Sequence, residues 1–503
     1  MSAPAQSAVP ATPHATWSDR VFSLPVVLGL LLVFLLLILS AGGSVVRTLA
    51  DDDIWWHLRN AAQLIQTHHF IRADSWTFTV AGQPWVNPEW LSELPFYFAY
   101  QWLGERGLYL LTMVLASAII IGVYWLGWLR SRSWKAAFLT TLAAILFASV
   151  SIAPRTLLFG WLFLILELAI LWTLHEGQDF TWFLPPLFCL WINAHGSWFI
   201  GFVLMLLFFA SGWIAGEWGN LYSIRWTPQQ ARKLIGVTGL STAALFMNPY
   251  GWRLVVYPLN ALLHHQLGTE SIAEWASLDF HTIRGKFVLA VLLLFLIAQL
   301  VRRRRWPIQD LVFAAVAIYA AFAYTRFLFL AGIIVMPFFA RALRNSEVQN
   351  ETAPPPQPRG ARLFWAAAMA ALVLMIAQKY PSAARIHSGI AETLPQSALP
   401  YVRGLAGQGN LFNTFDWGGY LEWQAPQVKE FIDPRVDIFV QHGVMADYLS
   451  AVHLEDTFAV LDKYQIRYAL INPRTPMAYL LGHSSKWKRS YDDGRAVVFE
   501  RTH

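Results

Sequence analysis

The sequence contains a single cysteine, Cys189, which lies inside an apolar run. One thiol excludes an internal disulfide and cannot supply a cluster of thiolates for a metal ion. Cysteine usage therefore gives no indication of the redox compartment in which the protein works.

Charged residues are also scarce. They make up 14% of the 503 residues, whereas hydrophobic residues make up 56% and the mean hydropathy is +0.42. These values exclude a soluble globular protein with an ordinary charged surface, and the 25 tryptophans suit a chain with many membrane interfaces. The net charge of +6 does not point to nucleic acid, because the basic residues lie in short loops between apolar segments. We predict an α-helical polytopic membrane protein.

The sequence lacks a loop for binding nucleotide phosphates. No Gly-rich stretch is followed by Lys-Ser or Lys-Thr, and "WGGYLEW" does not have the spacing of a dinucleotide fingerprint. Neither ATP nor a nucleotide-sugar donor is supported by the sequence.

About eleven apolar windows are long enough, or nearly so, to cross a bilayer, for which about twenty residues are needed. They are 24–46, 107–129, 135–152, 157–174, 181–193, 198–215, 234–247, 287–301, 311–323, 327–339 and 363–376. Residues 1–20 are polar and rich in Pro and Ala, and are predicted to form a disordered cytoplasmic tail before a transmembrane domain over 21–378. Although "LSAGGS" resembles a cleavage site, the first window is longer than the core of a signal peptide and is interpreted as a retained span.

The basic residues give this topology an orientation. If the N-terminus is cytoplasmic, every strong basic cluster falls on the cytoplasmic side, as the positive-inside rule requires. These clusters are Arg130, Arg132 and Lys135; Arg225, Arg232 and Lys233; Arg302 to Arg305; and Arg341, Arg344, Arg359 and Arg362. An odd number of spans then places the chain from residue 379 onward outside, in the periplasm of a bacterial cell.

The same alternation brings the unusual polar residues to the outer interface. They are Asp51, Asp52, Asp53, Arg155, Asn193, His195, Ser197, Asn248, Glu274, Trp275 and Arg326. Ionisable groups near a bilayer are costly and commonly functional, so the set is a candidate site. Taken singly, each has a structural alternative: the arginines can snorkel at helix ends, and the amides can form turns.

The first outer loop, residues 51–106, is longer than a hairpin requires. Apolar residues recur at helical spacing after the acids, while His57 lies on the polar face, and a second such stretch covers 87–104. We expect two amphipathic helices at the membrane surface. One aspartate can favour a helix N-terminus, but three adjacent carboxylates repel one another. They indicate a cation, a cationic partner or a general base.

Four stretches carry a resemblance to a known family: "DDDIWWHL", "ADSWTFTVAGQPWVNPEWLSE", "WINAHGSWFIG" and "FNTFDWGGYLEW". With the order of spans, they resemble the GT-C glycosyltransferases, which include protein O-mannosyltransferases and lipid A aminoarabinose transferases. More narrowly, they resemble bacterial membrane proteins classed beside the galacturonosyltransferases that modify lipopolysaccharide. The resemblance covers nearly the whole chain and is more specific for architecture than for substrate.

The resemblance implies an inverting transfer of a sugar from a polyprenyl-phosphate donor to an acceptor outside the membrane. By position, Asp51 and Asp53 match the family's acidic pair, and the extra Asp52 leaves the identity of the base open. We favour Asp51 as the base, with Asp53 supporting it. No cofactor is fixed by the sequence, although Asp51 and Asp53 could hold a divalent cation such as Mg²⁺ or Mn²⁺.

Physical reasoning is compatible with these roles. A positioned carboxylate assists a hydroxyl nucleophile by taking its proton, and a leaving phosphate requires positive charge. The candidates for binding the donor phosphate or sugar are His57, Arg155, Asn193, His195, Glu274, Trp275 and Arg326. For each histidine alone, a structural role is the stronger expectation.

Residues 379–503 are predicted to form a small α/β domain outside the membrane. "GNLFN", "KEFID", "RYALIN" and "AVVFERT" are typical of short strands, and "GVMADYLSAV" and "DTFAVLDKY" of helices. In "FIDPRVDIF" the acids and Arg435 alternate, which favours an internal salt-bridged turn over a ligand or metal site.

The resemblance thus implies a GT-C-type glycosyltransferase in the bacterial inner membrane, acting on an envelope lipid, glycan or protein. Two other classes stay open. A transporter or flippase of lipid-linked sugars would place ionisable residues near mid-span, as Glu167 is. A non-catalytic envelope assembly or binding protein would use the C-terminal domain to hold a polymer.

Overall fold

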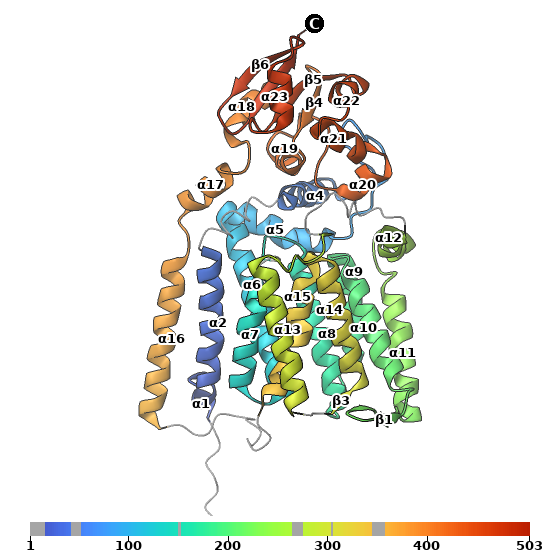
Figure 1. Cartoon of the computed structure of the whole chain (residues 1–503), viewed down its shortest axis with the longest axis vertical. Helices are drawn as coiled ribbons and strands as arrows, with labels where there is room; N and C mark the ends of the chain where they lie inside the picture. Colours follow the sequence, from blue (N-terminus) through green and yellow to red (C-terminus); the bar gives the residue numbers. More distant parts are fainter. Residues whose placement is uncertain are drawn as a thin grey trace, which may run out of the picture.

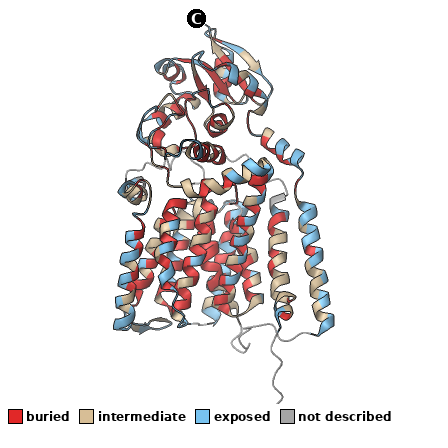
Figure 2. Cartoon of the chain, turned by 180° about the vertical axis from the view of Figure 1, so that it is seen from behind, coloured by how far each residue is buried: buried red, intermediate tan, exposed pale blue. Residues whose placement is uncertain are grey.

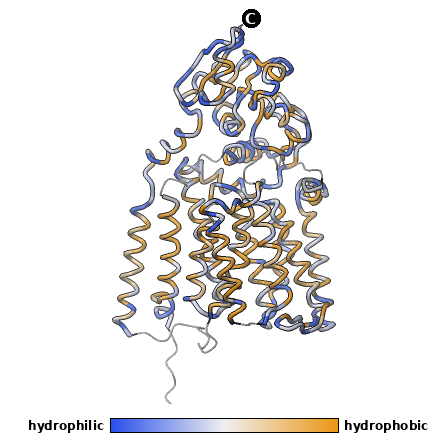
Figure 3. The backbone as a smooth tube through the Cα atoms, in the orientation of Figure 1, coloured by the Kyte–Doolittle hydropathy of each residue, from blue (hydrophilic) through white to orange (hydrophobic). Residues whose placement is uncertain are grey.

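The computed structural model describes residues 16–41, 52–148, 152–263, 275–302, 305–344 and 358–502. Figure 1 shows a bundle of upright helices beneath a smaller C-terminal unit that contains a sheet. The expected class, a mainly helical membrane protein with a small C-terminal α/β region, is confirmed. Figure 3 shows the apolar residues concentrated in the bundle and the hydrophilic ones in the C-terminal unit.

Each of the eleven predicted windows overlaps a helix of the bundle. These helices are α2 (Leu24–Ala41), α6 (Glu105–Ser131), α7 (Trp134–Ala148), α8 (Leu157–His175), α9 (Leu184–Ala194), α10 (Trp198–Ser211), α11 (Pro228–Ala244), α13 (Ile283–Arg302), α14 (Ile308–Ala323), α15 (Leu328–Leu343) and α16 (Arg359–Lys379). Among the described residues, 6 helices are long and apolar enough to cross a membrane, and α7, α10 and α14 are shorter apolar helices. The protein is therefore an integral membrane protein, and the number of crossings stays a prediction.

Burial differs sharply between helices of similar composition. In α15, 78% of the apolar window is buried, because α6, α7, α13 and α14 surround it. In α16 the corresponding share is 6%, and this helix packs chiefly against α2 at the margin of the bundle. A helix that is apolar all round can be a core helix or face lipid, so only the structure separates the two cases.

The described residues of the basic clusters lie on elements at the end of the bundle away from the C-terminal unit (Figure 1). Asp310 joins two of them there, since it binds both Arg130 and Arg341. A small sheet that the sequence did not predict lies at the same end, formed by β1 (Gly216–Trp218), β2 (Leu221–Ser223) and β3 (Trp306–Pro307). That this end is cytoplasmic stays a prediction from the charge pattern.

Three helices lie across the opposite end of the bundle: α4 (Asp53–Thr67), α5 (Trp90–Leu103) and α12 (Trp252–Leu263). The first two are the predicted amphipathic helices. His57 and Asn60, on the polar face of α4, are 2% and 3% exposed. Both side chains bind Glu93 of α5, and α19 of the C-terminal unit also packs against α4.

The C-terminal unit holds a four-stranded sheet of β4 (Asn410–Asn413), β5 (Ile466–Ile471), β6 (Trp487–Asp492) and β7 (Val497–Arg501) in the order β4-β5-β7-β6. Strand β4 is parallel to β5, and the remaining pairs are antiparallel. Its helices are α17 (Ala383–Ala391), α18 (Leu399–Gly404), α19 (Gly418–Gln424), α20 (Val436–Gln441), α21 (Val444–Val452), α22 (Thr457–Lys463) and α23 (Pro476–Gly482).

Three of the four predicted strands are present in this sheet. The fourth, "KEFID", forms only isolated bridges from Glu430 to Thr77 and Leu411, while β6 was not predicted. Helix α16 ends at Lys379 and α17 begins at Ala383, close to the predicted change of domain. The limits of the domains stay a prediction.

Candidate active site

The polar residues of the outer loops gather between the bundle and the C-terminal unit. Asp53 begins α4, Arg155 and Thr156 directly precede α8, and His195 follows α9. Each of these positions is a helix end on the same side of the bundle, so the loops bring the side chains together. Asp51 and Glu274 lie outside the described residues.

Asp53 faces Arg155 at the start of this cluster. Asp53 Oδ2 lies 3.8 Å from Arg155 Nε, and Asp53 Oδ1 accepts a hydrogen bond from Trp56 Nε1 at 3.3 Å. The two charged side chains are 30% and 16% exposed, so the pair keeps access to solvent or a ligand. Asp52, the preceding residue, is half-buried.

A glycine allows the C-terminal unit to approach this acidic segment. A Cβ on Gly419 of α19 would lie 2.7 Å from the carbonyl oxygen of Asp52 and 3.2 Å from the amide nitrogen of Trp56. The "WGGY" stretch therefore has a packing role: its second glycine lets α19 lie directly on the first turn of α4.

Glu89, which the sequence analysis did not single out, links both histidines. Its carboxylate lies 3.4 Å from His57 Nε2 and 3.3 Å from His195 Nε2, and it accepts a hydrogen bond from Thr156 Oγ1 at 2.7 Å. Burial raises the pKa of Glu89, and the lowering effects of His57 and Thr156 do not fully offset this. A carboxyl group whose pKa is raised accepts a proton more readily than an exposed carboxylate.

His57 is held by a second carboxylate. Its Nδ1 lies 2.9 Å from Oε1 of Glu93, which is fully buried and also accepts hydrogen bonds from Asn60 and Asn87. Burial alone would lower the pKa of His57, but the hydrogen bond to Glu93 and the neighbouring carboxylates raise it above the ordinary value. His57 is therefore favoured as an imidazolium.

His195, in contrast to His57, is favoured in its neutral form. Burial, followed by the charges of Arg326 and His57, lowers its pKa to about 3. Its Nδ1 accepts a hydrogen bond from the backbone N–H of Ser197 at 2.9 Å, so the neutral ring carries its proton on Nε2 and donates toward Glu89. Gly160 makes room for this arrangement, since a Cβ there would lie 3.2 Å from His195 Nδ1.

The remaining predicted residues have different positions. The side chain of Asn193 accepts a hydrogen bond from Trp90 Nε1 at 2.9 Å and donates to the carbonyls of Cys189 and Met247. It therefore links the end of α9 to the start of α5 and to the segment after α11. The Arg326 guanidinium lies 5.2 Å from the centre of the Trp275 ring. The charge of Arg326 also contributes to the lowered pKa of His195.

The C-terminal unit contributes a further acid at this interface. Asp437, in α20, accepts a hydrogen bond from Tyr257 Oη of α12 at 3.1 Å. Burial raises the pKa of Asp437 to about 6, against the lowering effects of Tyr257, Arg435 and Trp85. No local pattern predicts this contact, because Tyr257 and Asp437 are 180 residues apart in the sequence.

The arrangement combines proton acceptors with fixed cations. Asp53 and Glu89 are carboxylates within reach of solvent, while Arg155, Arg326 and protonated His57 supply positive charge. Such a set can deprotonate a nucleophile and bind an anionic leaving group in one place.

Comparisons with known proteins identify the fold. No protein-family model matches the sequence, and no curated protein matches it. Among solved structures, the oligosaccharyltransferase of Archaeoglobus fulgidus, tethered to an acceptor peptide, is 16% identical with a TM-score of 0.53 over 88% of this chain and 68% of that chain. The archaeal oligosaccharyltransferase AglB from Archaeoglobus fulgidus, in complex with an inhibitory peptide and a dolichol-phosphate, is 15% identical, with a TM-score of 0.52 over 88% of this chain and 69% of that chain.

ArnT from Cupriavidus metallidurans, bound to undecaprenyl phosphate, matches over more of both chains. It is 13% identical, with a TM-score of 0.50 over 95% of this chain and 97% of that chain. AglB and ArnT are both GT-C membrane glycosyltransferases. The expected resemblance is therefore confirmed, and the chain has the GT-C fold.

Proposed function

We propose that the protein is a membrane glycosyltransferase that moves a sugar from a polyprenyl-phosphate donor to an acceptor of the cell envelope, with inversion. The observation that carries the proposal is the pairing of Asp53 with Arg155 at 3.8 Å, at the end of a GT-C bundle and beneath a C-terminal unit. A carboxylate and a guanidinium, both partly exposed, can there serve the acceptor and the leaving phosphate respectively.

The acidic segment supplies the base in this proposal. Deprotonation of the acceptor hydroxyl as the new bond forms makes it a competent nucleophile. Asp53 lies beside the Arg155 guanidinium, and a nearby positive charge makes a carboxylate a weaker base. We therefore assign the proton transfer to Asp51 and a supporting role to Asp53. Asp51 and Asp53 are also the proposed ligands of a divalent cation, Mg²⁺ or Mn²⁺, should the reaction require one.

The cations and the aromatic ring bind the donor. Arg155 and Arg326 have the planar guanidinium that suits phosphate oxygens, and Trp275 can stack against a sugar ring. The Nε2–H of His195 points toward Glu89 and can donate a hydrogen bond to a phosphate oxygen of the bound lipid. The dolichol-phosphate bound to AglB and the undecaprenyl phosphate bound to ArnT support a donor of this chemical class.

The orientation follows from the charge pattern. We place the N-terminus in the cytoplasm of a bacterium, the bundle in the inner membrane and the C-terminal unit outside, above the site. The acceptor would then be an envelope lipid, glycan or protein that approaches from outside.

The proposal is tested by transfer of a radiolabelled sugar from a panel of polyprenyl-phosphate donors to envelope extracts by the purified protein. Asp51→Asn and Asp53→Asn are expected to lose transfer while retaining a monodisperse elution profile. The control is Asp456→Asn, which changes an exposed acid of the C-terminal unit. Parallel reactions with a chelator, Mg²⁺ or Mn²⁺ test the metal requirement. Full transfer by both variants would contradict the assignment.

One observation favours a transporter instead. Glu167 lies within α8, is fully buried, and both of its carboxylate oxygens lack a hydrogen-bond partner within the described structure. An ionisable group inside a span is typical of a transport pathway. Movement of a lipid-linked sugar across vesicles that is lost in Glu167→Gln, with no transfer from any donor, would favour that function.

A further inference from the structure

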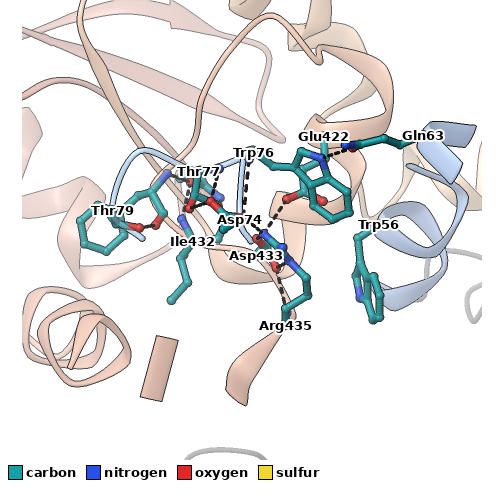
Figure 4. A network of polar contacts seen from close by, with 12 residues as sticks. Trp56, Gln63, Asp74, Trp76, Thr77, Thr79, Glu422, Ile432, Asp433 and Arg435 are labelled. Atoms are coloured by element: carbon teal, nitrogen blue, oxygen red, sulfur yellow. Dashed lines mark hydrogen bonds and ion pairs between the residues drawn. The ribbon is translucent and has the colours of Figure 1, made fainter. Parts of the chain in front are cut away.

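A second group of acids lies between the first outer loop and the C-terminal unit. This group, which we call the Glu430 cluster, consists of Asp74, Glu422, Glu430, Asp433 and Arg435. All five side chains are at most 3% exposed. Four carboxylates face one guanidinium, so the cluster has a formal charge of −3 when ionised. Figure 4 shows most of its members converging.

Arg435 neutralises only part of this charge. Its guanidinium binds Asp433 through two nitrogens, at 2.9 and 2.6 Å, and Asp74 at 2.6 Å. It contacts two neighbouring aromatic rings, with its central carbon 4.3 Å from the centre of the Trp76 ring and 4.8 Å from the centre of the Trp85 ring. The predicted salt-bridged turn is therefore present, and it extends to the outer loop through Asp74.

The two glutamates are left with unsatisfied oxygens. Neither carboxylate oxygen of Glu430 has a hydrogen-bond partner within the described structure, nor does Oε2 of Glu422. The other oxygen of Glu422 lies 3.4 Å from Arg435. Burying an unpaired carboxylate costs several kcal/mol, so such groups require a bound cation or protonation.

The geometry points to a cation. One carboxylate oxygen from each of Glu422, Glu430 and Asp433 lies within 4.8 Å of the other two. This separation is about twice the 2.4 Å bond between calcium and oxygen. We propose that Glu422, Glu430 and Asp433 bind a hard divalent cation, Ca²⁺ or Mg²⁺, whose ligands are all oxygen atoms. The site is distinct from the acidic segment at Asp51 and Asp53 and does not depend on the proposed transfer reaction.

The position of the cation gives it a structural role. Glu430 joins the two parts of the molecule through its backbone, since its carbonyl accepts a hydrogen bond from Phe78 at 3.2 Å and it bridges to Thr77. Thr79 Oγ1 donates to the carbonyl of Phe431 at 2.6 Å. A cation on the Glu430 side chain therefore holds in place the segment of the C-terminal unit that pairs with the first outer loop.

Shared protons are the alternative occupant. Burial, followed by the charge of Asp433, raises the pKa of both Glu422 and Glu430 well above the ordinary range. Two neutral carboxyl groups would then share hydrogen bonds without any ion. The two occupants differ in a simple way: only a cation site responds to chelation.

The test uses the full-length protein in detergent, treated with EDTA and then titrated with Ca²⁺ or Mg²⁺. We expect the Tm to rise by about 2–3 °C with the preferred ion at about one hundred times its Kd. Elemental analysis after gel filtration should give one ion per chain. The two titrations decide between calcium and magnesium.

Variants connect the response to these residues. Glu430→Gln and Glu422→Gln are expected to lose both the bound ion and the rise in Tm, while Glu455→Gln, an exposed acid of the same unit, keeps them. Because Gln is uncharged, Glu430→Gln should still fold, and its metal-free Tm should equal or exceed that of the wild type. A wild-type protein with no bound ion and an unchanged Tm would overturn the proposal in favour of protons. A cation response that persists in both variants would also overturn it.

Discussion

Glu93 supports the polar interior of the candidate site, and Glu93→Gln should weaken it in a measurable way. The buried carboxylate accepts hydrogen bonds from His57, Asn60 and Asn87, with distances of 2.9 Å to His57 Nδ1 and to Asn87 Nδ2. The amide in Glu93→Gln keeps one accepting oxygen. Its NH2 group, however, replaces the other oxygen and faces the N–H groups that donate to Glu93 in the wild type. It also removes the negative charge beside His57.

The expected cost follows from these contacts. Breaking a buried charge pair costs about 3–5 kcal/mol, and a buried donor left unpaired costs about 1–3 kcal/mol. His57 can lose its proton in the variant, so the total should lie near the lower end, at about 3 kcal/mol. A loss of this size lowers the Tm by several degrees.

The pH dependence of the Tm provides a second test of the prediction for Glu93→Gln. The pKa of His57 is raised in the folded protein. A raised pKa contributes stability that is complete below the ordinary value near 6.5 and is lost as the pH rises through the folded-state value. The wild-type Tm should therefore fall above about pH 6.5, and Glu93→Gln should flatten this slope.

The assay is thermal unfolding of the detergent-purified protein, followed by tryptophan fluorescence from about one pH unit below to about two pH units above the ordinary histidine pKa of about 6.5. The control is Glu105→Gln, because the Glu105 carboxylate makes a single 3.3 Å contact with the exposed His387. That change should cost less than about 1 kcal/mol. If both variants showed the same Tm and the same pH slope, the reasoning about Glu93 would be refuted.

Three further predictions concern the interface between the bundle and the C-terminal unit. Gly419→Val should lower both the Tm and the transfer activity, because even a Cβ at this position would lie 2.7 Å from the carbonyl oxygen of Asp52. Thermal unfolding and the transfer assay measure the two effects, and an unchanged Tm would contradict this prediction. Arg155→Lys should lower kcat/KM for transfer by about tenfold or more, since a point charge replaces the guanidinium beside Asp53, whereas an unchanged value would show that the planar group is not used. The wild type should lose stability as the pH rises from about 4 to 6, because a pKa raised to about 6 makes ionisation of Asp437 unfavourable to the folded state. Asp437→Asn should not show this loss, and measurement of Tm against pH tests the sign.

The helices of the bundle could be predicted because a membrane imposes a local requirement. A run of apolar residues must form a helix there, whatever its neighbours are. The same runs do not show which helices are central, and α15 and α16 have similar hydropathies but opposite burial. The short strand β6 was missed because its residues alternate weakly and its partner β7 determines its position.

The site was predictable in location but not in its connections. The charge pattern placed Asp53, Arg155 and His195 on one side of the membrane, and the structure brings Asp53 and Arg155 together. Glu89 was not singled out, because it appears in the sequence as an ordinary residue at the start of a helix. Its partners His57 and His195 come from separate loops. Asp437 was missed for the same reason, since its contact with α12 is made only after the C-terminal unit has docked.

The seam between the first outer loop and the C-terminal unit also sets the order in which the molecule can be completed. Arg435 and Asp74 are 361 residues apart in sequence, and the Thr79 contact spans 352. At about 5–20 residues per second, the loop leaves the ribosome about 20 to 70 s before its partners exist. During that interval the acids of the loop stand at the membrane without the cover above them. A nascent chain thus carries the acidic segment early but acquires an enclosed site only in the last moments of its synthesis.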